Sequence, residues 1–475
     1  TISVTDGTNT HVIGNKLTSP YFGFEALSSN TTGNYNVAVG YNALKANTTG
    51  NNNVALGYKA LFTNTTGEHN IAVGLDSLRV NVTGHSNTAV GYNALRLNTV
   101  NYNTAIGYKT LTSNTTGVEN TALGYDALRY NTIGKRSVAV GYNALRVNTT
   151  GNDNVAVGYQ ALTTNTIGNY NTALGYYSLR YNTTSEKNTA VGYHALHSNT
   201  IGNQNTAVGT QALQLNTTGY QNTAVGYYAL YTNTIGKENT AVGKSALFAN
   251  TTGGYNVAVG YHALKSNTTG QYNTALGYYS LQTNTTGISN TAIGTNALKL
   301  NTIGNYNIAI GHSSLYTNTT GSYNTAIGFE ALNLNTIGDQ NTAIGYESLD
   351  VNTTGTHNTA VGVHSLGANT IGQYNTAIGH SALKINTTGV NNVAVGYQSL
   401  LTNTIGVNNI AVGKWALKMN TTGSYNTAVG YEAMKLNTIS RYNVALGFGS
   451  LSINTTGEGN SAVGYYTLKN NTIGQ

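Results

Sequence analysis

Short apolar runs recur along the chain at an interval of 17 residues, and polar, glycine-containing segments separate them. Asn30 opens the phrase Asn-Thr-Thr-Gly-Asn-Tyr-Asn-Val-Ala-Val-Gly-Tyr-Asn-Ala-Leu-Lys-Ala, which restarts at Asn47 and, for the last time, at Asn471. This gives 26 complete units, of which only the one opening at Asn98 is short, by one residue. We number the positions of each unit from 1, the opening Asn, to 17. Such units stack because one alone cannot bury its apolar face.

Each unit contains one strong strand signal, at positions 8 to 10. Position 9 is always Ala, position 10 is always Val, Ile or Leu, and position 8 is mostly Thr or Val. Glycine follows at position 11 in every unit and occurs at position 4 in nearly all of them. A short β-branched strand between glycine corners predicts an all-β repeat solenoid, a parallel β-roll or β-helix of 26 units.

The second segment of the unit, positions 12 to 17, leaves two conformations open. Its frequent Tyr at position 12 and its Leu at position 15 have the i, i+3 spacing of one helical turn, but a short second strand is an equal alternative. Position 3 also alternates between Thr and Ile from Asn114 onward, with one lapse. This 34-residue period reflects either duplication of a double unit or a solenoid turn that contains two units.

Both faces of the predicted strand are restricted, since neither position 9 nor position 10 accepts a polar residue. Alternate residues of a strand point to opposite faces. We therefore expect position 9 to face the core of the coil and position 10 to face a second layer. That layer is either the Leu-bearing segment of a double-unit turn or a partner chain.

Asparagine and glycine form the expected structural ladders of the stack. Asn at position 7 tolerates turn geometry, and identical amides on successive coils can bond one another. Glycine at position 11 indicates a positive φ angle or a close backbone approach. The first members of these two rows are Asn36, Asn53, Asn70 and Asn87, and Gly40, Gly57, Gly74 and Gly91.

The chain divides into residues 1–29, an N-terminal cap or inter-subunit pairing segment, and residues 30–475, the repeat solenoid. The first residue is Thr1, so we expect a processed chain or part of a longer one. The repeat stays regular to its last residues, and we expect no polar cap there. An open strand edge accepts further strands. We therefore expect the C-terminal edge of one subunit to receive the N-terminal segment of the next.

Composition removes several function classes. The chain has no cysteine, which excludes disulfides and thiolate chemistry. No apolar run approaches the ~18 residues of a membrane span, and a net charge of +7 over 475 residues is too dilute for nucleic-acid binding. No catalytic or phosphate-binding motif is present. We expect a non-enzymatic protein without cofactor or metal; His194 and His197, although close in sequence, are expected to be solvated.

Two rows of side chains are candidate binding surfaces. Position 16 is Lys or Arg in 12 units, so more than half of the basic residues fall on one line. This possible polyanion stripe, which could attract acidic polysaccharide, begins with Lys45, Arg79, Arg96, Arg129, Arg146 and Arg180. Position 12 is Tyr in 16 units, which suits either structural packing or sugar binding. Thr-rich rows also suggest ice binding, although no Thr-x-Thr pair recurs.

The phrase Asn-Thr-Ala-Val-Gly-Tyr at residues 87–92 resembles the head repeats of trimeric autotransporter adhesins. Those repeats carry an Asn-Ser-Val-Ala-Ile-Gly-like core in slightly shorter coils, and the resemblance implies a left-handed parallel β-roll and a homotrimer. The longer phrase, with Asn-Thr-Thr-Gly after Ala-Leu, is similar to repeats of phage tail fibres and related surface proteins. The resemblance extends over residues 30–475.

Together these features predict a non-catalytic structural subunit of an extracellular fibre or filament that assembles by strand pairing and solenoid stacking. Its partner is then itself, as an end-to-end homopolymer or a homotrimer, and surface polysaccharide is a further candidate. The alternatives are an adhesin or tail-fibre-like receptor-binding protein for surface glycans, and an ice-binding solenoid. Each alternative places the chain outside the cell or on a cell or virion surface.

Overall fold

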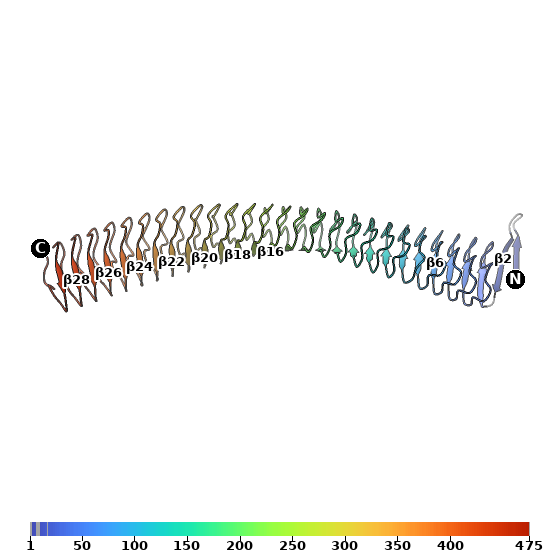
Figure 1. Cartoon of the computed structure of the whole chain (residues 1–475), viewed down its shortest axis with the longest axis horizontal. Coiled ribbons are helices and arrows are strands. Elements are labelled where there is room, and N and C mark those ends of the chain that lie inside the picture. The colour runs from blue at the N-terminus through green and yellow to red at the C-terminus, as the bar shows by residue number, and fades with distance from the viewer. Residues whose placement is uncertain (1, 6–9, 17, 475) are drawn as a thin grey trace. The chain divides into compact units, whose positions relative to one another are not determined.

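A computed structural model describes residues 2–5, 10–16 and 18–474, with side chains from residue 18 onward. The chain forms two compact units, Thr1–Glu238 and Asn239–Gln475, and each is a β-solenoid (Figure 1). The described residues contain no helix, and so none long enough to cross a membrane.

The first unit contains strands β1 to β15. Three of them precede the regular coils: β1 (Ile2–Thr5), β2 (Thr10–Lys16) and β3 (Ser19–Phe22). The other twelve have three residues each and cover positions 8 to 10 of their repeats: β4 Val37–Val39, β5 Val54–Leu56, β6 Ile71–Val73, β7 Thr88–Val90, β8 Thr104–Ile106, β9 Thr121–Leu123, β10 Val138–Val140, β11 Val155–Val157, β12 Thr172–Leu174, β13 Thr189–Val191, β14 Thr206–Val208 and β15 Thr223–Val225.

The second unit contains fourteen strands of the same kind: β16 Thr240–Val242, β17 Val257–Val259, β18 Thr274–Leu276, β19 Thr291–Ile293, β20 Ile308–Ile310, β21 Thr325–Ile327, β22 Thr342–Ile344, β23 Thr359–Val361, β24 Thr376–Ile378, β25 Val393–Val395, β26 Ile410–Val412, β27 Thr427–Val429, β28 Val444–Leu446 and β29 Ser461–Val463. From β16 to β29 each strand pairs in parallel with the next one along the chain.

One repeat makes one turn of the solenoid. In the first unit, strands β3 to β15 pair in parallel with their sequence neighbours. Ala38 lies opposite Ala55, 17 residues on, whereas Ala89 lies opposite Ala105, because the repeat opening at Asn98 is one residue short. The predicted parallel β-solenoid is confirmed, and the alternative with two repeats per turn is wrong.

The alternative of a helical turn at positions 12 to 17 is also wrong. Positions 13 and 15 both have a positive φ, as at Asn42 (57°) and Leu44 (52°), and a right-handed helix requires negative values. The backbone groups of this segment bond to adjacent coils instead. The N–H of Leu44 donates to the carbonyl of Ala60 at 2.9 Å, and that of Asn42 donates to the carbonyl of Phe24 at 2.9 Å.

The core is thin and consists mainly of small side chains. Ala at position 9 is buried in every coil and the position-15 side chain in every coil but the last, where Leu468 is exposed; Ala or Ser usually fills position 14. The branched residue of position 10 lies on the opposite face of its strand. Leu56 and Leu174 are each 46% exposed, so no described segment of this chain forms the expected second layer over position 10.

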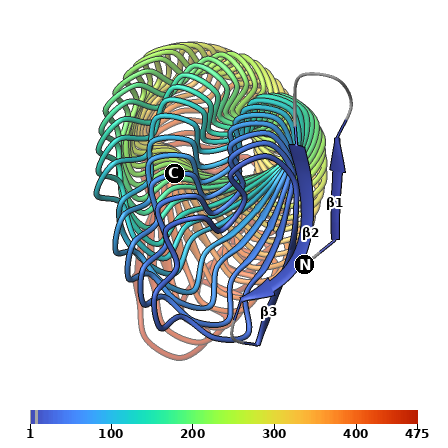
Figure 2. The ribbon, with the colours of Figure 1, turned by 90° about the vertical axis from the view of Figure 1, so that its right-hand side faces the viewer.

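The N-terminal segment extends the sheet with the opposite strand direction. β2 pairs antiparallel with β3, placing Ile13 opposite Phe22, and β1 pairs antiparallel with β2 (Figure 2). Part of the predicted cap, residues 1, 6–9 and 17, lies outside the described residues. The described part lies against the first coil of its own chain, and donation of this segment to another subunit stays a prediction.

Candidate functional site

The position-7 asparagines lie in the core and bond one another in an amide ladder, which Ser137 interrupts. Asn36, Asn53, Asn70 and Asn87 are fully buried. The side-chain nitrogen of Asn53 donates to the Oδ1 of Asn36 at 3.1 Å and to the carbonyl of Gly67 at 2.8 Å. The backbone N–H of Asn53 donates to the same Oδ1 at 2.9 Å. Each amide therefore bonds to the coil before it and to a corner glycine of the coil after it, which is a structural role.

The position-11 glycines form a close backbone contact between coils. Gly40, Gly57, Gly74 and Gly91 have φ angles between 126° and 135°, in a region that disfavours other residues. A Cβ atom on Gly57 would lie 2.6 Å from the carbonyl oxygen of Gly74. Glycine is needed here both for its conformation and for its lack of a side chain.

The predicted basic stripe is largely neutralised in the first unit. Position 13 of several coils carries a carboxylate that contacts the stripe. Asp126 lies 2.8 Å from Arg129 and 3.5 Å from Arg146, and its side chain is only 5% exposed. Asp76 contacts Arg79 and Arg96 in the same way, and Glu25 contacts Lys45.

Arg180, the sixth residue proposed for the stripe, packs against aromatic rings. Its guanidinium lies 4.3 Å from the ring centre of Tyr177 and 5.0 Å from that of Tyr181. Each of the six named cations therefore contacts either a carboxylate of position 13 or an aromatic ring. The stripe is therefore a weaker polyanion surface than its sequence suggests.

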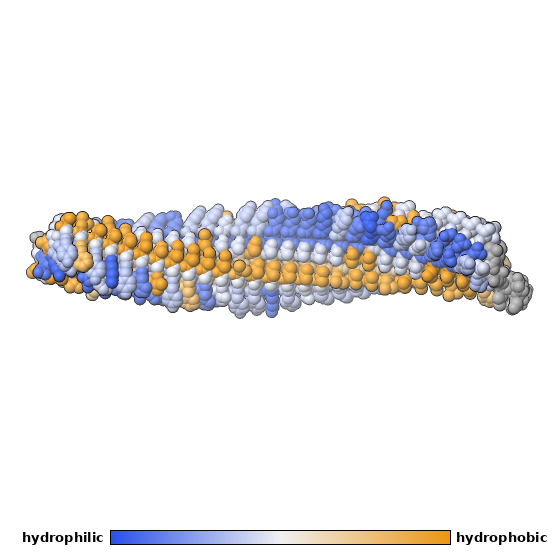
Figure 3. Space-filling view, turned by 90° about the horizontal axis from the view of Figure 1, so that it is seen from below, coloured by the Kyte–Doolittle hydropathy of each residue, from blue (hydrophilic) through white to orange (hydrophobic). Residues whose placement is uncertain are grey.

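The outer sheet face, defined here as the side chains of positions 8 and 10, is uncovered and combines mostly threonine or valine at position 8 with an aliphatic row at position 10. Position 10 is aliphatic in all coils, and Leu123 and Leu276 are 44% and 46% exposed. Apolar residues line up in stripes along the coils on the face drawn in Figure 3. Extended apolar surfaces of this kind mark sites of protein association.

Seven consecutive coils of the first unit place tyrosine at position 12, from Tyr92 to Tyr193, and we call this row the tyrosine stack. Neighbouring rings lie 4.8–5.5 Å apart between centres, with planes within 14° of parallel. Each ring covers the face of the next, so the stack exposes ring edges. Sugars bind aromatic faces, and the stack leaves few of these free.

The two histidines singled out in the sequence lie together. The rings of His194 and His197 stack at 4.7 Å, and both side chains are partly buried where solvated ones were expected. Burial, together with His194 and Arg180, lowers the pKa of His197 to about 4. The described residues contain no group of three metal-ligating side chains that could hold a metal ion.

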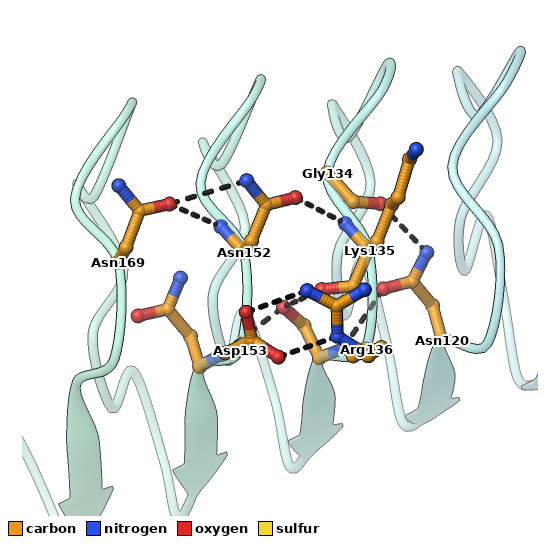
Figure 4. Close-up of polar contacts among 9 residues, drawn as sticks. Asn120, Gly134, Lys135, Arg136, Asn152, Asp153 and Asn169 are labelled. Atoms are coloured by element: carbon orange, nitrogen blue, oxygen red, sulfur yellow. Dashed lines mark hydrogen bonds and ion pairs between the residues drawn. The ribbon is translucent and has the colours of Figure 1, made fainter.

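A groove of about 490 Å³ lies on the surface of the first unit. Lys135 and Arg136 line it with Thr116, Ile133, Thr150 and Asn152. Arg136 donates to both carboxylate oxygens of Asp153, at 2.7 and 2.9 Å (Figure 4). This bidentate contact lowers the pKa of Asp153. Lys135 and Arg136 are both exposed, and Arg136 is the one paired with Asp153.

The second unit has a smaller hollow of about 270 Å³, which results from small residues at positions 16 and 17. Gly367 and Ala368 stand between Asp350 and Lys384 on the neighbouring coils. Burial, followed by the charges of nearby carboxylates, raises the pKa of Asp350 to about 6.

Sequence reasoning missed both depressions, although each has a signal in the aligned repeats. Ser137, the one exception to Asn at position 7, stands beside Lys135 and Arg136, and Gly367 is the only glycine at position 16. Comparison with protein-family models and with curated proteins finds no match for this chain.

Proposed function

We propose that this protein is a non-catalytic structural subunit of an extracellular fibre or filament, placed outside the cell or on a cell or virion surface. The observation that carries this proposal is the uncovered outer sheet face. Parallel sheets are normally covered on both faces. Here position 10 remains partly exposed along β4 to β15 and along β16 to β29, although it is aliphatic in every coil.

A second copy of the chain is the partner that best fits this face. Both copies have the same repeat, so aliphatic rows of equal spacing can pack along many coils at once. Only 8% of the chain is charged, which keeps repulsion between copies low. The resemblance to trimeric adhesin heads and tail-fibre repeats supports a homotrimer. End-to-end strand pairing, which yields an open homopolymer, is the other mode of assembly.

The test compares two double variants by analytical ultracentrifugation over a range of concentrations. Leu123→Lys with Leu174→Lys puts charges on the outer sheet face, where both leucines are exposed by more than 40%. Gln204→Lys with Gln221→Lys adds the same charge at exposed polar positions. We expect the wild type and the glutamine variant to associate and the leucine variant to remain monomeric. A monomeric wild type, or equal association of all three, would reject lateral assembly through this face.

An adhesin or tail-fibre-like receptor-binding protein is the second candidate, and the groove beside Lys135 favours it. The groove breaks the symmetry of the repeat and combines a cation with hydroxyl and amide groups, which suits an acidic surface glycan. Binding to a glycan array by the wild type, with loss in Lys135→Ala, would support this function; equal binding by both proteins would argue against the groove.

Ice binding receives less support from the hydroxyl groups of the repeat. The position-2 threonines donate their hydroxyls to the adjacent coil, as Thr48 does to the carbonyl of Thr65 at 3.1 Å. At position 3, threonine alternates with exposed isoleucine such as Ile167 and Ile201. A measurement of thermal hysteresis separates this candidate from the other two.

A further inference from the structure

The tyrosine stack combines close ring contact with solvent access. The rings of Tyr108 and Tyr125 lie 4.8 Å apart with an interplanar angle of 11°, and those of Tyr125 and Tyr142 lie 5.3 Å apart at 14°. These three side chains are 38%, 45% and 42% exposed. The exposed part of a ring stacked on both faces is its edge, which carries the phenolic hydroxyl and the two ortho carbons beside it.

Phenols lose one electron and one proton together when a one-electron oxidant reaches them. The resulting radical has much of its unpaired density on the ortho carbons. Two such radicals combine when their rings are close, and the fixed geometry of the coils supplies this proximity in advance. Each inner ring of the stack has its neighbours at contact distance on the coils before and after it.

We propose that the tyrosine stack is a site of oxidative coupling, where a peroxidase-type oxidant with hydrogen peroxide joins tyrosines of neighbouring coils as dityrosine. Two phenols each give one electron to the oxidant and one proton to water. A carbon–carbon bond forms between their ortho carbons, and the hydrogens on these carbons shift to the oxygens, which restores both rings. The two electrons and two protons reduce one hydrogen peroxide to two waters.

The bond would join adjacent coils of a chain that has 36 tyrosines and no cysteine. It would therefore supply the covalent link between coils that disulfides cannot provide here. This inference is independent of the fibre proposal, because the coupled residues belong to one chain.

Tyr130 offers a matched comparison in the same region. It is 36% exposed, but it lies between the guanidinium groups of Arg129 and Arg146, at 4.9 and 5.1 Å from its ring centre. It belongs to position 17 and so lies outside the tyrosine stack. A reaction that depends on exposure alone would modify Tyr130 as readily as Tyr125, whereas coupling through the stack favours Tyr125.

The test oxidises dilute wild-type protein with peroxidase and hydrogen peroxide, followed by trypsin digestion and mass spectrometry. Cleavage after Lys109, Arg129, Arg136 and Arg146 gives peptides 110–129 and 137–146, which contain Tyr125 and Tyr142 as their only tyrosines. We expect these two peptides to be linked, with the loss of two hydrogen atoms from their summed mass. Peptide 130–135, which carries Tyr130, should remain unlinked.

Two variants separate coupling in the stack from random oxidation. Tyr125→Phe keeps the stacked ring but lacks the phenolic hydroxyl, so the 110–129/137–146 link should be lost. Tyr130→Phe should leave this link unchanged. The proposal is overturned if the link forms in equal yield in urea-unfolded protein, if peptide 130–135 is linked as often, or if folded wild-type protein forms no dityrosine.

Discussion

The amide oxygen of Asn205 accepts two hydrogen bonds from Asn222 on the next coil. One comes from the backbone N–H at 3.0 Å and the other from the side-chain nitrogen at 3.1 Å. Both residues are fully buried, so water cannot replace either bond. The same pair of bonds recurs along much of the position-7 row, and it couples the stability of each coil to that of its neighbour.

Replacing Asn205 by Ala should therefore destabilise the solenoid locally. The substitution removes the acceptor of the two hydrogen bonds that Asn222 donates to Asn205. Leaving a buried polar group without its hydrogen bond lowers the free energy of unfolding by about 1–3 kcal/mol. Urea unfolding and hydrogen exchange of the flanking coils measure the effect. Gln204→Ala is the control, because its side chain is exposed and adjacent in sequence. Equal stability of the two variants would mean that the amide ladder contributes little to the free energy of unfolding.

Gly57→Ala should be more damaging than a ladder variant. The new Cβ would overlap the carbonyl of Gly74, and alanine is strained at a φ of 135°. We expect a loss of about 3 kcal/mol or more, or failure to fold. Gly367→Ala is the matched control, since its nearest contact would be 3.4 Å away. Thermal unfolding followed by circular dichroism should show a large decrease in the midpoint temperature only for Gly57→Ala.

Asp126→Asn should strengthen binding to polyanions. The carboxylate of Asp126 contacts two arginines of the basic stripe, Arg129 and Arg146, and its removal leaves their charges uncompensated. Retention on a sulfated polysaccharide column should rise at low salt and the difference should shrink at high salt, because salt screens exposed charges. Glu186→Gln makes the same charge change elsewhere. Equal retention of these two variants would show that net charge, and not the basic stripe, determines binding to the column.

His197 should make the first unit less stable in acid. Its pKa is about 4 in the folded chain, below the ordinary value of 6.5, so the folded state favours the neutral ring. Between pH 6.5 and 4 the unfolded chain therefore binds the proton more readily, and stability falls as pH decreases through this range. His197→Gln should lose less stability over the same range in urea titrations. Parallel pH profiles for the two proteins would contradict the lowered pKa.

The sequence predicted the solenoid, its strands and its corners because these depend on local signals. The strict spacing of Ala, Gly and Asn constrains the backbone in every coil. The number of repeats per turn could not be decided in this way, since the 34-residue alternation of Thr and Ile lies on an exposed corner and does not affect pairing. The i, i+3 spacing of Tyr and Leu suggested a helical turn, but coil-to-coil bonds support a backbone with positive φ at Asn42 and Leu44.

The candidate surfaces were harder to predict because they depend on contacts between coils. Position 16 appears basic in the sequence, yet Asp76 and Asp126, which neutralise it, belong to position 13. The Leu-bearing segment packs on the other face of the strand, so it does not cover position 10, and cover by a partner chain stays a prediction. The hollow at Gly367 arises from a missing side chain between two coils, which only alignment of the repeats would reveal.

The register of one repeat per turn has a consequence for how such a chain can change in length. Every coil presents the same backbone partners to the coil before it and the coil after it. After the loss or gain of one 17-residue repeat within either unit, the coils on both sides still present matching backbone groups. The repeat at Asn98 lacks one residue at its corner, and its strand still pairs with the strand before it. Chains that differ by whole repeats should therefore keep the same pairing of strands from coil to coil.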